Sequence, residues 1–185
     1  MTNELQQQKD NNLTLVEKLR LKKRQSSNAA LLLDVSYSMS TDVEPGIPKI
    51  QALRETVSGL HTDREMFWFS SDFGSCTKDT IPNPMGGTNL SGLLKHIKEK
   101  GYKSCIILTD GDISDKAETL RSKGELNIKV MYIGAGPRPA FLDQLASSGI
   151  ATTEDLKQTK QLTEKVQLLL ESSAIAPEKK GPIQL

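Results

Sequence analysis

Histidine and cysteine, the side chains that most often act as nucleophiles, bases or soft-metal ligands, are scarce in this sequence of 185 residues. His61 and His96 are the only histidines, and both lie on predicted helix faces, which argues against a Ser–His–Asp arrangement. Cys76 and Cys105 form no Cys-x-x-Cys pair and are too few for a disulfide framework. We therefore expect a protein of a reducing compartment.

Long apolar runs and an excess of one charge are also missing. No apolar stretch approaches the roughly 20 residues that span a bilayer, and the first residues, MTNELQQQKDNN, lack the apolar core of a secretory signal. The net charge is only +1, so no global field favours nucleic acid or an anionic membrane. These absences predict a cytoplasmic protein that binds neither nucleic acid nor a membrane.

The sequence does contain short aliphatic runs that alternate with helical periodicities. Ala29–Val35 shows no polar alternation, which is typical of a strand buried on both faces, and Ile50, Leu53, Val57 and Leu60 have helical spacing. Further strands are predicted at 65–70, 104–110, 128–136 and 150–155, a short edge strand within 73–82, and further helices at 90–97, 117–123, 140–149 and 162–170.

This alternation predicts an α/β fold, with a doubly wound, mostly parallel central sheet and helices on both faces. We expect the domain to span residues 29–173. Residues 1–28 would form a polar, basic extension with a short amphipathic helix, and residues 174–185 a flexible tail. The extension and the tail could also dock on a partner.

Oxygen-bearing side chains gather where the predicted strands end. Asp34 ends the first strand, Asp110 ends the run SCIILTD, and Ser36 and Ser38 follow Asp34 at alternate positions. The glycines of the segment GGTNL let the backbone turn closely and can bring Thr88 to the same edge. Because ligands of such sheets bind at the carboxyl ends of the strands, we expect these five side chains to meet there.

Two carboxylates and three hydroxyls are hard oxygen ligands without a soft partner. They suit Mg²⁺, or Mn²⁺ in its place. Such a set leaves the ion under-neutralised and with an open coordination position.

The segments DVSYSM, GGTNL and LTDGD, in this order, resemble the metal-ion-dependent adhesion site of the von Willebrand factor A family. The resemblance covers residues 29–173 and implies that Asp34, Ser36, Ser38, Thr88 and Asp110 bind the metal ion. It also implies an antiparallel edge strand, for which SCTKDTI is the candidate. Where the family commonly has glycine this sequence has a tyrosine at position 37, which would place an aromatic ring at the mouth of the site.

The family's function is binding, so the resemblance implies a stand-alone, intracellular, non-enzymatic module. A partner protein would supply a Glu or Asp to the metal ion. Members of this kind act as adaptors of MoxR-type AAA+ ATPases or in toxic-anion resistance systems. We expect Asp34 to be a surface carboxylate, so that Asp34→Ala would weaken partner binding and leave the fold intact.

Other interpretations of the same residues stay open. Asp34 and the serines could simply cap a helix or form turns, and Asp112, Asp42 and Glu44 could belong to solvated loops. A haloacid-dehalogenase-type phosphatase needs a second acid where this sequence has Ser36. A Mg²⁺-dependent phosphatase or hydrolase that uses the same Asp and Ser side chains remains the alternative. An RNA-associated role of the Ro-like kind would need a large helical repeat region, for which this chain has no room.

Overall fold

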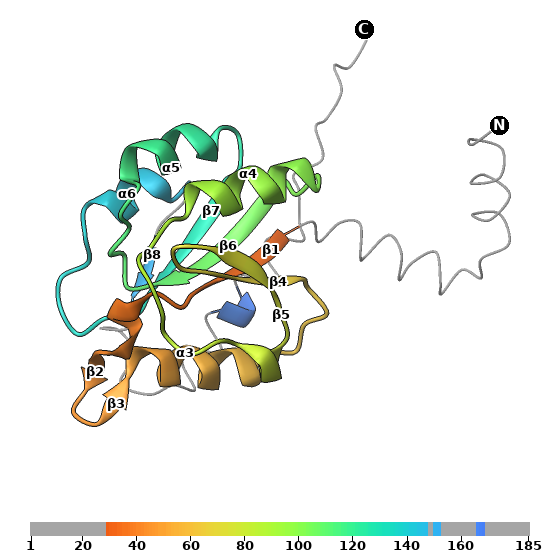
Figure 1. Ribbon diagram of the computed structural model, residues 1–185. Coiled ribbons are helices and arrows are strands. Elements are labelled where there is room, and N and C mark those ends of the chain that lie inside the picture. The colour runs from red at the N-terminus through yellow and green to blue at the C-terminus, as the bar shows by residue number, and fades with distance from the viewer. Residues whose placement is uncertain (1–28, 148–149, 153–165, 169–185) are drawn as a thin grey trace, which may run out of the picture.

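The computed structural model describes residues 29–147, 150–152 and 166–168, which include a six-stranded sheet with the order β5-β4-β1-β6-β7-β8 (Figure 1). Its strands are β1 (Ala29–Asp34), β4 (Met66–Phe69), β5 (Phe73–Cys76), β6 (Ser104–Thr109), β7 (Asn127–Tyr132) and β8 (Ile150–Thr152). The helices are α3 (Lys49–Ser58), α4 (Ser91–Glu99), α5 (Lys116–Lys123) and α6 (Phe141–Leu145). Shorter elements are the 3-10 helices η1 (Tyr37–Ser40) and η2 (Lys78–Thr80) and the hairpin of β2 (Asp42–Glu44) and β3 (Ile47–Pro48).

Strand β1 lies at the centre of the sheet, with parallel neighbours β4 and β6 on its two sides. All of its side chains are buried. Leu31 and Leu33 belong to the core on one face, whereas Ala30 and Leu32 belong to the core on the other. Burial on both faces explains why this stretch is continuously apolar instead of alternating.

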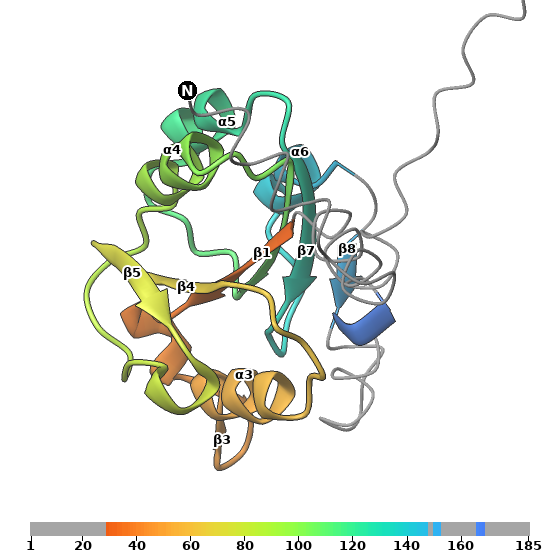
Figure 2. The ribbon, with the colours of Figure 1, turned by 90° about the vertical axis from the view of Figure 1, so that its right-hand side faces the viewer.

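Helices cover both faces of the sheet (Figure 2). Helix α3 packs through Ile50, Leu53 and Val57 on the face of Leu31 and Leu33. Helices α4 and α6, with part of α5, contribute to the core on the opposite face. The predicted doubly wound α/β fold, with its mostly parallel sheet, is therefore confirmed.

The strand order reverses at β1. The chain leaves β1 through α3 to β4 on one side, and later returns through α4 to β6 on the other side. The two connections part at the carboxyl ends of β1 and β6, and this topological switch point is where ligands bind in open α/β sheets. Asp34 ends β1, and Asp110 directly follows β6.

An antiparallel edge strand is present, but it lies earlier than the predicted stretch SCTKDTI. Strand β5 covers only Phe73–Cys76 and pairs with β4. The following residues turn into η2, where the hydroxyl of Thr80 accepts a hydrogen bond from the backbone N–H of Thr77 at 2.8 Å. This local capping competes with continued strand pairing and ends the strand.

The remaining differences are one additional hairpin and shifted ends of predicted elements. The hairpin at 42–48 was not predicted, and α3 ends at Ser58 although the apolar spacing continues to Leu60. The predicted N-terminal helix and the tail lie outside the described residues. Of the predicted closing helix only 166–168 is described, and Val166 there is fully buried against the α3 face. No helix among the described residues is long and apolar enough to cross a membrane.

Candidate functional site

Three loops meet at the carboxyl ends of β1 and β6, and we call this place the rim: residues 35–41, 83–90 and 110–115. Backbone hydrogen bonds join the loops to one another. The N–H of Tyr37 donates to the carbonyl of Gly86 at 3.1 Å, and the N–H of Ser114 donates to the carbonyl of Thr88 at 2.8 Å. The loop at 83–90 therefore lies between the other two, as the predicted meeting of the three motifs requires.

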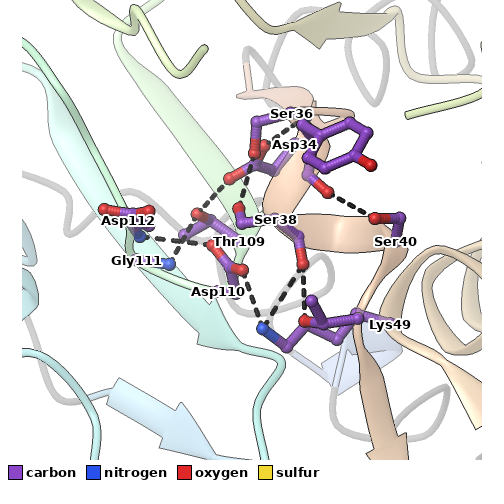
Figure 3. Close-up of polar contacts among 11 residues, drawn as sticks. Asp34, Ser36, Ser38, Ser40, Lys49, Thr109, Asp110, Gly111 and Asp112 are labelled. Carbon is purple, nitrogen blue, oxygen red and sulfur yellow. Dashed lines mark hydrogen bonds and ion pairs between the residues drawn. The ribbon is translucent and has the colours of Figure 1, made fainter. Parts of the chain in front are cut away.

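Asp34 lies at the base of the rim and is fully buried. One carboxylate oxygen accepts the backbone N–H of Ser36 at 2.9 Å, and the other accepts the hydroxyl of Thr109 at 2.5 Å (Figure 3). No cation contacts this carboxylate among the described residues. Burial, which outweighs these hydrogen bonds, raises its pKa from the ordinary 3.8 to about 6.

The burial of Asp34 corrects the expectation of a surface carboxylate. Truncation to Ala would leave a cavity and remove the acceptor of the Thr109 hydroxyl and the Ser36 N–H, so it would disturb the fold as well as the site. Asn is the better probe, because it removes the charge but keeps nearly the same shape and one of the two acceptor oxygens.

Ser36 and Ser38 lie beside Asp34, and their hydroxyl oxygens are 3.0 Å apart. Ser36 is extended backbone before η1, and Ser38 lies inside this short 3-10 helix. The change from strand to 3-10 helix places the two alternate side chains on one side of the chain, as the Asp-x-Ser-x-Ser spacing predicts.

Asp110 lies across the rim, and an ammonium group neutralises it. One of its carboxylate oxygens accepts from Lys49 Nζ at 2.9 Å, and the other accepts the backbone N–H of Asp112 at 3.2 Å. The same ammonium group lies 3.5 Å from the carbonyl oxygen of Ser38. Both partners of this ion pair are largely buried, with side-chain exposures of 16% for Lys49 and 3% for Asp110.

Thr88 is buried in the loop at 83–90, and its carbonyl accepts the N–H of Ser114. In the described part of the chain, no hydrogen bond joins its hydroxyl to the other four predicted ligands. The structure thus joins Asp34, Ser36 and Ser38 directly, and reaches Asp110 through Lys49 and the carbonyl of Ser38.

The loop that carries Thr88 is held by close backbone contacts. Gly86 has a positive φ of 60°, and a Cβ there would lie 2.5 Å from the hydroxyl oxygen of Ser71. The N–H of Gly87 donates to this same hydroxyl at 2.7 Å. Only glycine fits at position 86, which explains why the motif begins with a glycine pair.

Asp115 holds the same loop from the other side. Its two carboxylate oxygens accept the backbone N–H groups of Leu90 at 3.1 Å and Ser91 at 2.9 Å, and one also accepts the hydroxyl of Thr119 at 2.9 Å. Burial acts to raise the pKa of Asp115, but the hydrogen bonds from Ser91, Leu90 and Thr119 outweigh it and keep the pKa below its ordinary value. Asp115 thereby satisfies donors at the start of α4.

The sequence did not reveal Thr109, Lys49 or Asp115 as members of the rim. The only weak signal for Thr109 is its place as the last residue of the apolar strand β6, directly before Asp110. Lys49 and Asp115 carry no signal in the sequence, since each acts on a residue far along the chain.

The other acids near the rim are exposed to solvent, as expected if they do not bind the metal ion. Asp112 is exposed and contributes its backbone N–H to Asp110. Asp42 and Glu44 lie in the exposed hairpin strand β2, and Asp42 accepts the N–H of Gly46. The ring of Tyr37 is 71% exposed at the edge of the rim, as expected from its place in the motif.

The chemistry of the rim fits a hard divalent cation. Its side chains offer carboxylate and hydroxyl oxygens, which Mg²⁺ prefers. Among the described residues, no group of three or more His, Cys, Asp or Glu side chains could hold a metal ion, so a metal ion at the rim would depend on the hydroxyl oxygens as well. Among the described residues no cation pairs with the buried Asp34, whereas an ammonium group already binds Asp110.

Comparison with known proteins supports the fold. No protein-family model and no curated protein matches the chain. A solved structure described as von Willebrand factor type A from Catenulispora acidiphila is similar with a TM-score of 0.61 and 16% identity, over 79% of this chain and 42% of that chain. The RO (RSR) protein of Deinococcus radiodurans matches with a TM-score of 0.46 and 15% identity, over 68% of this chain and 31% of that chain.

This chain spans less than half the length of either of these two proteins. The likeness to the Catenulispora protein shows that the chain has a von Willebrand factor A-like α/β fold.

Proposed function

We propose that this chain is a Mg²⁺-dependent protein-binding module and that Asp34, Ser36, Ser38, Thr88 and Asp110 hold the ion. The observation that carries the proposal is the meeting of three loops, joined by backbone hydrogen bonds, at the switch point of the sheet. Mn²⁺ has the same preference for oxygen and can take the place of Mg²⁺.

When bound, the ion supplies an electrophilic centre to which a Glu or Asp of the partner coordinates. The chain's own residues prepare this contact. Asp34 contributes a buried negative charge, and Ser36 and Ser38 direct neutral oxygens to the same place. The charges of Asp34 and Asp110 equal that of a divalent ion in number, but they do not fill its coordination positions. Burial of the rim strengthens the attraction between the ion and a carboxylate of the partner.

We also propose that the module is not an enzyme. A carboxylate nucleophile must touch its substrate, but Asp34 is fully buried and both of its oxygens accept hydrogen bonds. Asp110 is engaged on both oxygens by Lys49 and Asp112. These contacts disfavour a phosphatase or hydrolase that uses either carboxylate as its nucleophile.

The adaptor role beside a MoxR-type AAA+ ATPase or a toxic-anion resistance system stays a prediction from the family resemblance, as does the cytoplasmic location. The partner side chain that the rim would recognise is a carboxylate, and the exposed ring of Tyr37 would contact the residues that flank it.

Calorimetry and affinity capture test the proposal together. The wild-type chain should take up Mg²⁺ at millimolar concentrations, and Asp34→Asn should weaken this uptake about tenfold or more. Proteins captured in Mg²⁺ should be released by EDTA and should not bind Asp34→Asn.

Asp143→Asn is the matched control, because it removes the same charge from an exposed residue of α6 that pairs with Arg138. It should bind Mg²⁺ and the partner as the wild type does. Absence of Mg²⁺ and Mn²⁺ uptake by the wild type, or capture that persists in EDTA, would contradict the proposal.

A further inference from the structure

Lys49 is the cation that the structure places inside the rim. It is the first residue of α3, and its backbone N–H donates to the carbonyl of Thr41 at 2.9 Å, which fixes the start of the side chain beside the loop that follows β1. From there the ammonium group reaches Asp110 at 2.9 Å and the Ser38 carbonyl at 3.5 Å. It thus contacts two of the five residues proposed to hold the metal ion.

Asp110 has little capacity left for a second cation while this ion pair exists. Lys49 takes one carboxylate oxygen, and the backbone N–H of Asp112 takes the other. A divalent ion held by Asp110 would also lie close to a positive charge in a largely buried environment, where repulsion is poorly screened.

We infer that Lys49 is a built-in competitor of the divalent ion, which neutralises Asp110 when the metal is absent and lowers the affinity of the rim for it. This inference rests on the proposed metal site. The four-carbon side chain of lysine is flexible, so Lys49 can leave Asp110 for water when a metal ion binds. When no metal ion is bound, Lys49 neutralises Asp110. Without this ion pair Asp110 would be a second buried carboxylate with an uncompensated charge, like Asp34, and the fold would be less stable.

Mn²⁺ binding, followed by the electron paramagnetic resonance signal of the free ion in metal-free buffer, tests this inference. Lys49→Met should bind Mn²⁺ about tenfold more tightly than the wild type, because a positive charge next to the site is gone. Lys49→Arg keeps the charge and should stay near the wild-type affinity.

Lys95→Met is the matched control. It removes one lysine from an exposed ion pair with Glu118 at 2.8 Å and should leave Mn²⁺ affinity unchanged. Lys49→Gln serves if Lys49→Met does not fold without metal, since Gln still offers a hydrogen bond to Asp110. Circular dichroism in EDTA decides which variant is used, and in the wild type the Lys49 ammonium signal in nitrogen-15 spectra should shift when Mg²⁺ is added.

The outcomes separate this inference from the proposed function. If the wild type binds Mn²⁺ and the neutral variants bind it no more tightly, Lys49 is not a competitor, but the proposed metal site is still supported. If only the neutral variants bind Mn²⁺, the inference holds and the metal-dependent function of the wild type fails. If neither binds, both are wrong, and an ammonium signal that does not move at Mg²⁺ saturation also overturns the inference.

Discussion

Asp34 and Asp115 are two acids at the same end of the sheet with opposite relations to the fold. Asp115 accepts hydrogen bonds from Leu90, Ser91 and Thr119, and they lower its pKa. Asp34 is more deeply buried and accepts fewer, so its pKa rises to about 6. The fold gains stability from the charge of Asp115, whereas the charge of Asp34 costs stability in the absence of a cation.

Under the proposed function, this difference separates a structural acid, Asp115, from a ligand-binding acid, Asp34. An acid kept in a place that disfavours its charge is expected where a ligand supplies the missing counter-charge. Asp115 requires no counter-charge from a ligand, because its carboxylate already accepts hydrogen bonds from the start of α4 and the Thr88 loop. The contrast favours the surroundings of Asp34, and not the Asp115 cap of α4, as the proposed binding site.

The largest expected effect concerns the pH dependence of stability in EDTA. The folded protein holds the Asp34 proton more tightly than the unfolded chain, so the free energy of unfolding falls as pH rises from the unfolded pKa of 3.8 toward about 6. Relative to Asp34→Asn, the wild type should lose about 3 kcal/mol between about pH 3 and about pH 7. Urea denaturation of both proteins at several pH values measures this loss.

Saturating Mg²⁺ should reduce this loss for the wild type and leave Asp34→Asn unchanged. If the two proteins kept a constant difference across the pH range without metal, burial would not disfavour the charge of Asp34 and the comparison would break.

The next effect concerns the cap of α4. Asp115→Ala removes the acceptor of two backbone N–H groups and of the Thr119 hydroxyl and should lower the free energy of unfolding by about 2 kcal/mol. Asp115→Asn keeps the acceptor for Leu90 and Thr119 and should lose about half as much. Thermal and chemical denaturation measure both values.

Mg²⁺ uptake sharpens the result for Asp115. Asp115→Asn should bind Mg²⁺ with nearly the wild-type affinity, because the Asp115 carboxylate binds Leu90, Ser91 and Thr119 and is not one of the proposed ligands. A loss of affinity as large as that of Asp34→Asn would show that the two acids share one role.

The smallest effect is expected at the mouth of the rim. Tyr37 is 71% exposed, and its backbone N–H, not its ring, holds Gly86. Tyr37→Ser should therefore change the free energy of unfolding by no more than about 0.5 kcal/mol and should leave Mg²⁺ affinity unchanged. Denaturation and calorimetry check both, and a loss above about 1 kcal/mol would mean that the ring is part of the fold.

The sequence predicted the parts of the molecule that follow from local patterns. Continuous apolar strands and their terminal acids located β1, β6 and the positions of Asp34 and Asp110, because strand ends fix the edge at which such residues meet. The edge strand was placed too late, since the competition between Thr77–Thr80 capping and strand pairing leaves no periodic signal.

The partners of the site residues were not predictable in the same way. Lys49 and Asp110 are 61 positions apart, and Thr109 and Asp34 are 75 apart. Such pairs depend on how α3 and β6 pack against β1, which no spacing within a single segment records. The exposure of Asp34 was misjudged for the same reason, because its neighbours Phe69 of β4 and Thr109 of β6 come from two other parts of the chain.

The hairpin of β2 and β3 is a suitable place to insert a probe near the rim. The three loops share backbone hydrogen bonds, so their lengths are fixed by one another. The tip of the hairpin at 44–46 is exposed, and Figure 1 shows the hairpin at the margin of the molecule beside α3. A fluorophore or an epitope inserted there would report on molecules that dock at the neighbouring rim, and it would leave the five residues proposed to hold the ion unchanged.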